Sequence, residues 1–179
     1  MSCRRPQPLI RVVCMVTAAV CGCARATPSA DTTGGFSIYL VTDPVSGQEA
    51  MDLDLGQLEL EELPILSGDD IEAYDWGTHE IALTDPARER TASLDVPVTT
   101  GVPFVVCVGD ERIYSGAFWV SWSSASFHGI VIDALYASVD NHPIRIQPGY
   151  PESPEFFEGE DRRSDPRILQ SLSQAGKLS

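Results

Sequence analysis

The stretch from Val102 to Trp119 places the strongest constraint on what this chain can fold into. Val102–Val108 is an almost continuous apolar run, Gly109-Asp110 is a turn signal, and Arg112–Trp119 is rich in branched and aromatic residues. This order predicts a β-hairpin. Because the first run shows no polar alternation, we expect its strand to be covered on both faces and central to a sheet. Cys107 in that run is predicted to be a small buried strand residue.

Other segments predict further strands around this hairpin. Met51–Glu61 alternates apolar and acidic residues with a break at Gly56, which is typical of a half-buried strand. Four more segments combine branched or aromatic residues with turn signals at their ends, as strands do: Phe36–Val41, Thr78–Leu83, Gly129–Leu135 and His142–Ile146.

Helix start signals occur at three places. Ser67–Asp70 predicts a capped helix that begins within Ile71–Tyr74, Thr84-Asp85-Pro86 predicts a helix to about Leu94, and Ser164-Asp165-Pro166 predicts a C-terminal helix. The apolar residues Ile168, Leu169 and Leu172 either dock this last helix on the domain or leave it loose. The predicted fold class is α+β, a single domain with a mixed or antiparallel sheet and helices packed on one face.

The first 23 residues predict export and lipid attachment. Arg4, Arg5 and Arg11 precede a short apolar run, Val12–Gly22, which ends at small residues before Cys23. The run is shorter than the ~20 residues that a membrane-spanning helix needs, so a lipoprotein signal peptide is favoured over a permanent span. We expect residues 1–22 to be removed, Cys23 to be acylated, and the protein to face the extracytoplasmic side of a cell-envelope membrane.

The rest of the chain divides by composition. Residues 23–35 form a small-residue tether, residues 36–157 the folded domain, and residues 158–179 a charged linker with the C-terminal helix. The formal net charge is −14, and removal of the three signal-peptide arginines makes the mature chain more acidic. Such a surface repels nucleic-acid phosphates and anionic headgroups. We therefore expect no nucleic-acid partner, and contact with the bilayer only through acylated Cys23.

No catalytic or metal-binding motif stands out. His79, His128 and His142 lie in separate segments without zinc-ligand spacing, so a structural or surface role is favoured for each. Asp52-x-Asp54 fails the calcium-loop pattern, because its sixth and twelfth positions are Gln57 and Leu63. We predict no cofactor and no metal. Paired carboxylates remain the one enzymatic alternative, because a chain with 26 acidic residues brings some of them close together.

Aromatic residues concentrate where the hairpin runs into the following loop, and interfaces are enriched in such side chains. We predict that Trp119, Trp122 and Phe127 contact a partner. Tyr114 and Phe118 are instead favoured as core residues. For Trp122, in the serine-rich loop, exposure and burial are equally favoured.

Three segments resemble the head subdomain of the first periplasmic domain of SecD and the fused SecDF export factors. They are Leu66–Ala73, Glu80–Thr84 with the helix after it, and Gly101–Ala117. The resemblance implies an α+β domain that contacts polypeptides outside the cytoplasmic membrane, and it supplies no catalytic residues. The chain departs from the family in its reversed Gly109-Asp110 turn, in lacking the proline that follows the hairpin, and in lacking transmembrane helices, so we expect no proton-driven transport.

Together these observations predict an envelope lipoprotein that is a protein- or peptide-binding module and not an enzyme. The alternatives are an envelope hydrolase that uses acidic residues and a domain that only supports envelope structure.

Overall fold

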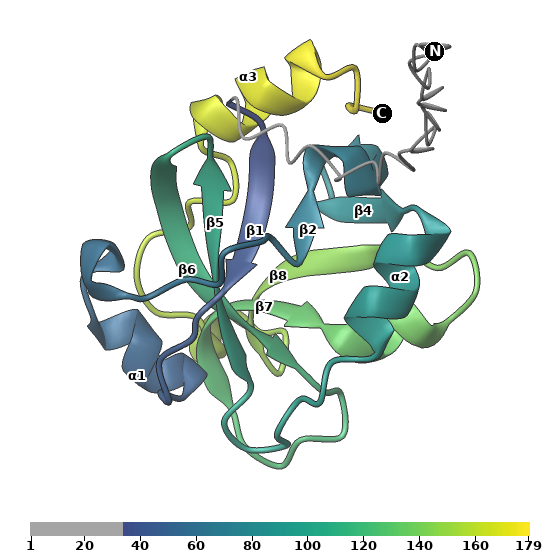
Figure 1. Cartoon of the computed structure of the whole chain (residues 1–179). Coiled ribbons are helices and arrows are strands. Elements are labelled where there is room, and N and C mark those ends of the chain that lie inside the picture. Colours follow the sequence, from purple (N-terminus) through teal and green to yellow (C-terminus); the bar gives the residue numbers. More distant parts are fainter. Residues whose placement is uncertain (1–33) are drawn as a thin grey trace, which may run out of the picture.

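The computed structural model describes residues 34–179, so the predicted signal peptide, Cys23 and most of the tether lie outside the described residues. The domain is built on one curled sheet of eight strands in the order β2-β1-β5-β6-β7-β8-β4-β3 (Figure 1). The strands are β1 Phe36–Leu40, β2 Leu66–Ser67, β3 Ile71–Asp75, β4 Glu80–Leu83, β5 Val102–Val108, β6 Glu111–Trp119, β7 Phe127–Asp133 and β8 Ile144–Tyr150.

The predicted hairpin is confirmed as β5 and β6, which pair antiparallel from Val102 opposite Phe118 to Val108 opposite Glu111. Its turn contains Gly109 at φ +58°, a left-handed conformation that glycine adopts without steric cost. On the other side β6 pairs parallel with β7. All other strand pairs in the sheet are antiparallel, so the sheet is mixed.

Strand β5 is covered on both faces, as its unbroken apolar run predicts. Phe104 and Val106 join the large core inside the curl, whereas Val105 and Cys107 join a smaller cluster on the outer face. Cys107 is 3% exposed, and burial raises the pKa of its thiol to about 11. The thiol therefore stays protonated at neutral pH and acts as an apolar packing group.

The helices cover both faces of the sheet and not one face as predicted. Ala50 of α1 packs in the outer cluster with Val105, whereas Ala87 of α2 and Ile168 of α3 belong to the inner core. Figure 1 shows α1 on a different side of the sheet from α3. Curling explains the difference, because it gives the sheet an inside to fill and an outside to cover. The α-helices are α1 Gly47–Asp52, α2 Asp85–Ala92 and α3 Pro166–Gln174, and the 3₁₀ turns are η1 Leu55–Gln57, η2 Gly68–Asp70, η3 Ala134–Ser138 and η4 Pro154–Phe156.

Two sequence predictions of local structure are wrong. Met51–Glu61 contains the end of α1 and the turn η1 in place of a strand, because Ser46 and Glu49 form a reciprocal capping box that starts a helix. Ile71–Tyr74 belongs to strand β3 in place of a helix. There the capping interaction of Ser67 with Asp70 serves only the short turn η2, and pairing with β4 fixes the following residues as a strand.

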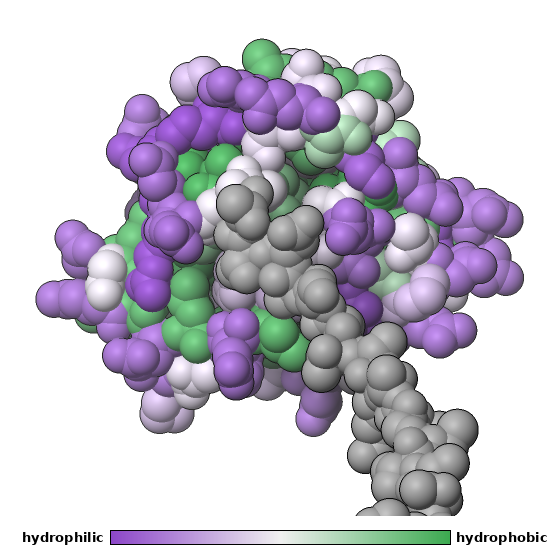
Figure 2. Space-filling view, turned by 45° about the horizontal axis from the view of Figure 1, so that its top comes forward, coloured by the Kyte–Doolittle hydropathy of each residue, from purple (hydrophilic) through white to green (hydrophobic). Residues whose placement is uncertain are grey.

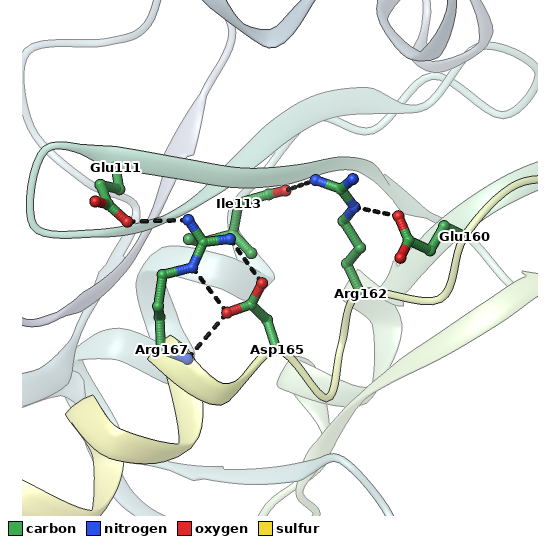
Figure 3. A network of polar contacts seen from close by, with 6 residues as sticks. All are labelled: Glu111, Ile113, Glu160, Arg162, Asp165 and Arg167. Atoms are coloured by element: carbon green, nitrogen blue, oxygen red, sulfur yellow. Dashed lines mark hydrogen bonds and ion pairs between the residues drawn. The ribbon is translucent and has the colours of Figure 1, made fainter.

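The C-terminal segment, residues 158–179, is packed on the domain. Ile168 and Leu172 are 0% and 1% exposed. Arg167 bridges Glu111 of β6 and Asp165, while Arg162 reaches the carbonyl of Ile113 (Figure 3). On the face shown in Figure 2, hydrophilic residues dominate the periphery. After α3, Leu178 forms a parallel bridge to Tyr74 and so occupies the outer edge of β3.

Candidate functional site

A hollow of about 320 Å³ opens on the side of the sheet where β4 and β8 meet the segments that follow β6 and β7. Its lining combines carboxylates, one guanidinium, a histidine and two tyrosines, so it offers charged, hydrogen-bonding and aromatic contacts together. We call it the β8 groove. Its lining residues are Glu80, Ser121, Asp133, Tyr136, His142, Pro143, Arg145, Gln147, Tyr150, Pro151 and Glu152.

Asp133 places a buried carboxyl at the groove. It ends β7, is 5% exposed, and caps η3 by accepting a hydrogen bond from the Leu135 amide at 2.9 Å. Burial raises the pKa of Asp133, and hydrogen bonds from Leu135 and Ser121 oppose the rise. The carboxyl therefore holds a proton to a higher pH than an exposed aspartate does. It can accept hydrogen bonds or pair with a cation that enters the groove.

An aromatic pair forms one wall of the groove. The rings of Tyr136 and His142 stack with centroids 4.8 Å apart and planes 17° from parallel, and Tyr136 is 39% exposed. The Nδ1 of His142 donates to the carbonyl of Pro143 at 2.8 Å, so Nε2 is the ring atom left for a ligand. Flat, partly exposed rings of this kind take part in stacking and cation–π contacts.

Helix α2 holds the segment that carries the Tyr136–His142 pair. Arg88 donates to the carbonyls of Val139 and His142 at 3.1 and 2.7 Å, and these two bonds fix the segment between η3 and β8. On the opposite side, Arg145 pairs with Glu152. The hydroxyl of Tyr150 donates to the Ser121 carbonyl at 2.6 Å and ties the serine-rich loop to β8. The groove therefore draws on five chain segments that anchor one another.

The predicted partner-binding residues divide in the structure. Trp119 and Phe127 are 2% and 1% exposed and stack on each other with centroids 5.2 Å apart, so their prediction as surface contacts is corrected. Both fill a cluster on the outer face of the sheet. Gly101 approaches Trp119 so closely that a Cβ there would lie 2.6 Å from the indole ring. Trp122 is 62% exposed and follows Ser121, which lines the groove.

The remaining aromatic and histidine predictions can also be placed. Tyr114 and Phe118 are buried, as expected. His79 is buried against Tyr74, and His128 is paired with Glu158 near the surface. Within residues 34–179, no group of three or more histidine, cysteine or acidic side chains is arranged to hold a metal ion.

The sequence did not predict the groove itself. Its residues come from β4, the loop after β6, the end of β7, η3 with the following loop, and β8, and no local spacing shows that these segments converge. One signal was present in the sequence: Asp133 is the only charged residue in the predicted strand Gly129–Leu135. A lone carboxylate at the end of a buried strand indicates either a helix cap or a site, and here Asp133 caps η3 and lines the groove.

Comparison of the chain with models of protein families, with curated proteins and with solved structures finds no match. In the part of the chain that the structure describes, none of the helices has the length and apolar character required to cross a membrane.

Proposed function

We propose that the chain is a cell-envelope lipoprotein, held by acyl chains on Cys23, whose domain binds a protein or peptide without catalysing a reaction. The arginines, the apolar run and Cys23 at the start of the sequence support attachment and compartment. The strong net negative charge supports a partner other than nucleic acid. The resemblance to the SecDF head, carried by the β5–β6 hairpin and its flanking segments, supports contact with polypeptides outside the cytoplasmic membrane.

The β8 groove is the proposed binding site. The observation that carries this proposal is the placement of a partly exposed aromatic stack, Tyr136 with His142, beside the buried carboxyl of Asp133. Rings supply contact area at low entropic cost, and a fixed carboxylate supplies direction. Trp122 is 62% exposed and lies next in sequence to the lining residue Ser121, so we include it in the proposed contact surface.

The chemistry of the lining favours a peptide with a basic side chain. Three carboxylates, those of Glu80, Asp133 and Glu152, line the hollow, against the single guanidinium of Arg145. Arg145 is already paired with Glu152. A lysine or arginine of the ligand would meet Asp133 and the Tyr136–His142 rings, where charge attraction and cation–π contact act together.

Binding can be tested with the full chain purified in detergent and short synthetic peptides that differ only in a central lysine, norleucine or glutamate. We expect the lysine peptide to bind most tightly, and Asp133→Asn and His142→Ala to weaken it at least about tenfold, the loss of one good polar or cation–π contact. Leu63→Ala is the matched control, because Leu63 is 65% exposed and lies outside the groove. Equal affinities for all three peptides, or equal losses in the control, would reject the proposed site.

Lipid attachment is tested by intact mass and membrane fractionation of the native protein beside Cys23→Ala and Cys14→Ala variants. We expect a diacylglyceryl-sized mass and membrane residence in the native and Cys14→Ala proteins only. Unmodified protein in the soluble fraction would reject the anchor.

A hydrolase that uses acidic residues is the second candidate, and the raised pKa of Asp133 in a groove with other carboxylates favours it. Such a carboxyl could serve as a general acid toward a glycosidic bond. Glycan and ester substrates should be screened with native and Asp133→Asn protein, with and without EDTA. Turnover that disappears in the variant would replace the binding proposal with the enzymatic one.

A further inference from the structure

His79 lies beneath the C-terminal segment in a nearly closed polar environment. It is 7% exposed and adopts a left-handed backbone conformation with φ +57° at the turn between β3 and β4. Its Nδ1 is 3.0 Å from the hydroxyl of Tyr74, and its Nε2 is 3.4 Å from the hydroxyl of Ser164. The ring is edge-on to Trp76 at 5.8 Å. The imidazole is therefore the point where the β3–β4 turn meets the segment before α3.

Residues 160–165, which we call the strap, connect this turn to two strands of the sheet. The Arg163 side chain is 13% exposed, pairs with Asp161, and donates to the carbonyl of Ile146 in β8 at 2.9 Å. Arg162 reaches the carbonyl of Ile113 in β6. Ser164 contacts His79. The strap is thus held largely by charged side chains, one of them close to a histidine that can gain a charge.

The strap shares a strand with the β8 groove. Ile146 donates its amide to the carbonyl of His79 at 3.0 Å and accepts from Arg163 through its own carbonyl. Its neighbours on β8, Arg145 and Gln147, line the groove, and so does Glu80, the residue after His79. One backbone position therefore joins His79, the strap and the groove lining.

We propose that protonation of His79 releases the strap and loosens the β8 groove, so that the groove holds its ligand at neutral pH and lets it go in acid. Protonation adds a second positive charge in the buried space beside the Arg163 guanidinium. The two charges repel each other, and this repulsion weakens the hydrogen bond from Arg163 to the carbonyl of Ile146. The effect of this release on ligand binding rests on the proposed function of the groove. The release of the strap itself is independent of that function.

The charges around His79 set the direction of the effect. Burial lowers the pKa of His79, and Arg163 lowers it further, while Asp161 and Asp75 oppose the shift. The closed state, in which the strap is packed on His79, therefore favours the neutral ring. In the open state, with the strap released, the imidazole is in water and titrates near 6.5. The closed state loses stability relative to the open state as pH falls below that value, and the loss ends below the pKa of the closed state.

Hydrogen exchange and the NMR titration of the imidazole test the release without any ligand. Between pH 7.5 and pH 5.5 we expect opening of the strap and α3 to increase by up to about tenfold, the limit that linkage sets one pH unit below the solution pKa of an imidazole. Amides of the β5–β6 hairpin should keep their protection. His79→Asn should abolish the pH effect, because asparagine tolerates a positive φ and keeps a polar atom near the Nδ1 position but does not titrate. His128→Asn should leave it intact.

Three results would overturn the release: no change in strap protection over this range, the same change in His79→Asn, or loss of protection in the hairpin together with the strap. The ligand arm measures binding of the lysine peptide at both pH values. Weaker binding at pH 5.5 in the native protein but not in His79→Asn supports regulation of the groove. Absence of binding at every pH rejects the proposed function. In that case the hydrogen-exchange result alone tests whether protonation of His79 releases the strap.

Discussion

The β5–β6 hairpin and the C-terminal segment both close on the interior of the curled sheet, but different forces hold them. The hairpin is held by backbone pairing over its whole length and by buried residues such as Phe104 and Phe118. The C-terminal segment has fewer apolar anchors, chiefly Ile168 and Leu172, and a short backbone bridge from Leu178 to Tyr74. Ion pairs and guanidinium–carbonyl bonds supply its other contacts with the domain. Apolar burial responds weakly to salt and acid, whereas charge pairing responds to both. The hairpin is therefore expected to carry most of the stability, and the C-terminal segment is expected to respond to salt and pH.

The largest effect is expected from Phe118→Ala in the hairpin. Phe118 is fully buried and meets Phe104 edge-on at 5.2 Å, so its loss should cost about 3–5 kcal/mol of unfolding free energy. Urea denaturation of the variant beside Trp122→Ala provides the measurement. Trp122 is 62% exposed, and its replacement should change stability by less than about 0.5 kcal/mol. Similar costs for the two variants would contradict the assignment of the core.

A smaller effect is expected from Leu172→Ala in α3. The side chain is 1% exposed, but the helix rests on the end of the sheet and can settle into the space, so a cost of about 2 kcal/mol is expected. Hydrogen exchange should show the loss first in residues 166–178 and only later in the hairpin. If hairpin amides lose protection to the same extent, the two regions unfold as one unit and the contrast between them fails.

Removal of the α3 cap should cost less again. Asp165 accepts a hydrogen bond from the amide of Arg167, and Asp165→Ala should lower the unfolding free energy by about 1 kcal/mol. The hydrogen bonds with Arg167 lower the pKa of Asp165 to about 2. Its contribution is therefore complete above about pH 4 and is lost as pH falls through 2. The difference from the native protein should vanish in strong acid, and Asp165→Asn should keep much of the cap.

The smallest effect is expected at the exposed end of the same network. Arg167→Gln removes the ion pairs with Glu111 and Asp165 seen in Figure 3. Exposed pairs contribute little and are screened by salt, so the loss should be below that of Asp165→Ala and should disappear in about 1 M salt. Thermal melts at low and high salt provide the measurement. A loss that persists in high salt would show that packing of the Arg167 stem matters more than its charge.

Local signals predicted those parts of the fold that neighbours in the sequence determine. The predicted bounds of the hairpin are close to the observed ones, and Thr84-Asp85-Pro86 starts α2 as expected. Distant partners override such signals elsewhere. Ile71–Tyr74 follows a capping signal yet is a strand, because β4 pairs with it. The parallel pairing of β6 with β7 leaves no local pattern at all.

The site was harder to predict than the fold. The concentration of aromatic residues around Trp119 predicts a partner contact, but the outer face of the sheet buries Trp119 against Phe127 and Tyr150. The charged run at Glu158–Arg163 looked like a solvated linker, but Arg163 turns inward to a backbone carbonyl. Charge and aromaticity in one sequence do not reveal which partners the sheet brings to them.

The strand order has a consequence for how the chain acquires its structure. β1 pairs with β2 and β3 with β4 within the first half of the chain, but both strand pairs join the rest of the sheet only through the second half, where Ile38 pairs with Val106 and Ile81 with Ile144. Strand β4 can pair with β8 only after β8 is available. When the chain is released starting from its N-terminus, β8 is the last strand to become available. Contacts this far apart in sequence close slowly, because loop entropy is lost before they form. The domain is therefore expected to stay unfolded until nearly all of it has been released, which is the state in which a chain can be threaded through a narrow passage.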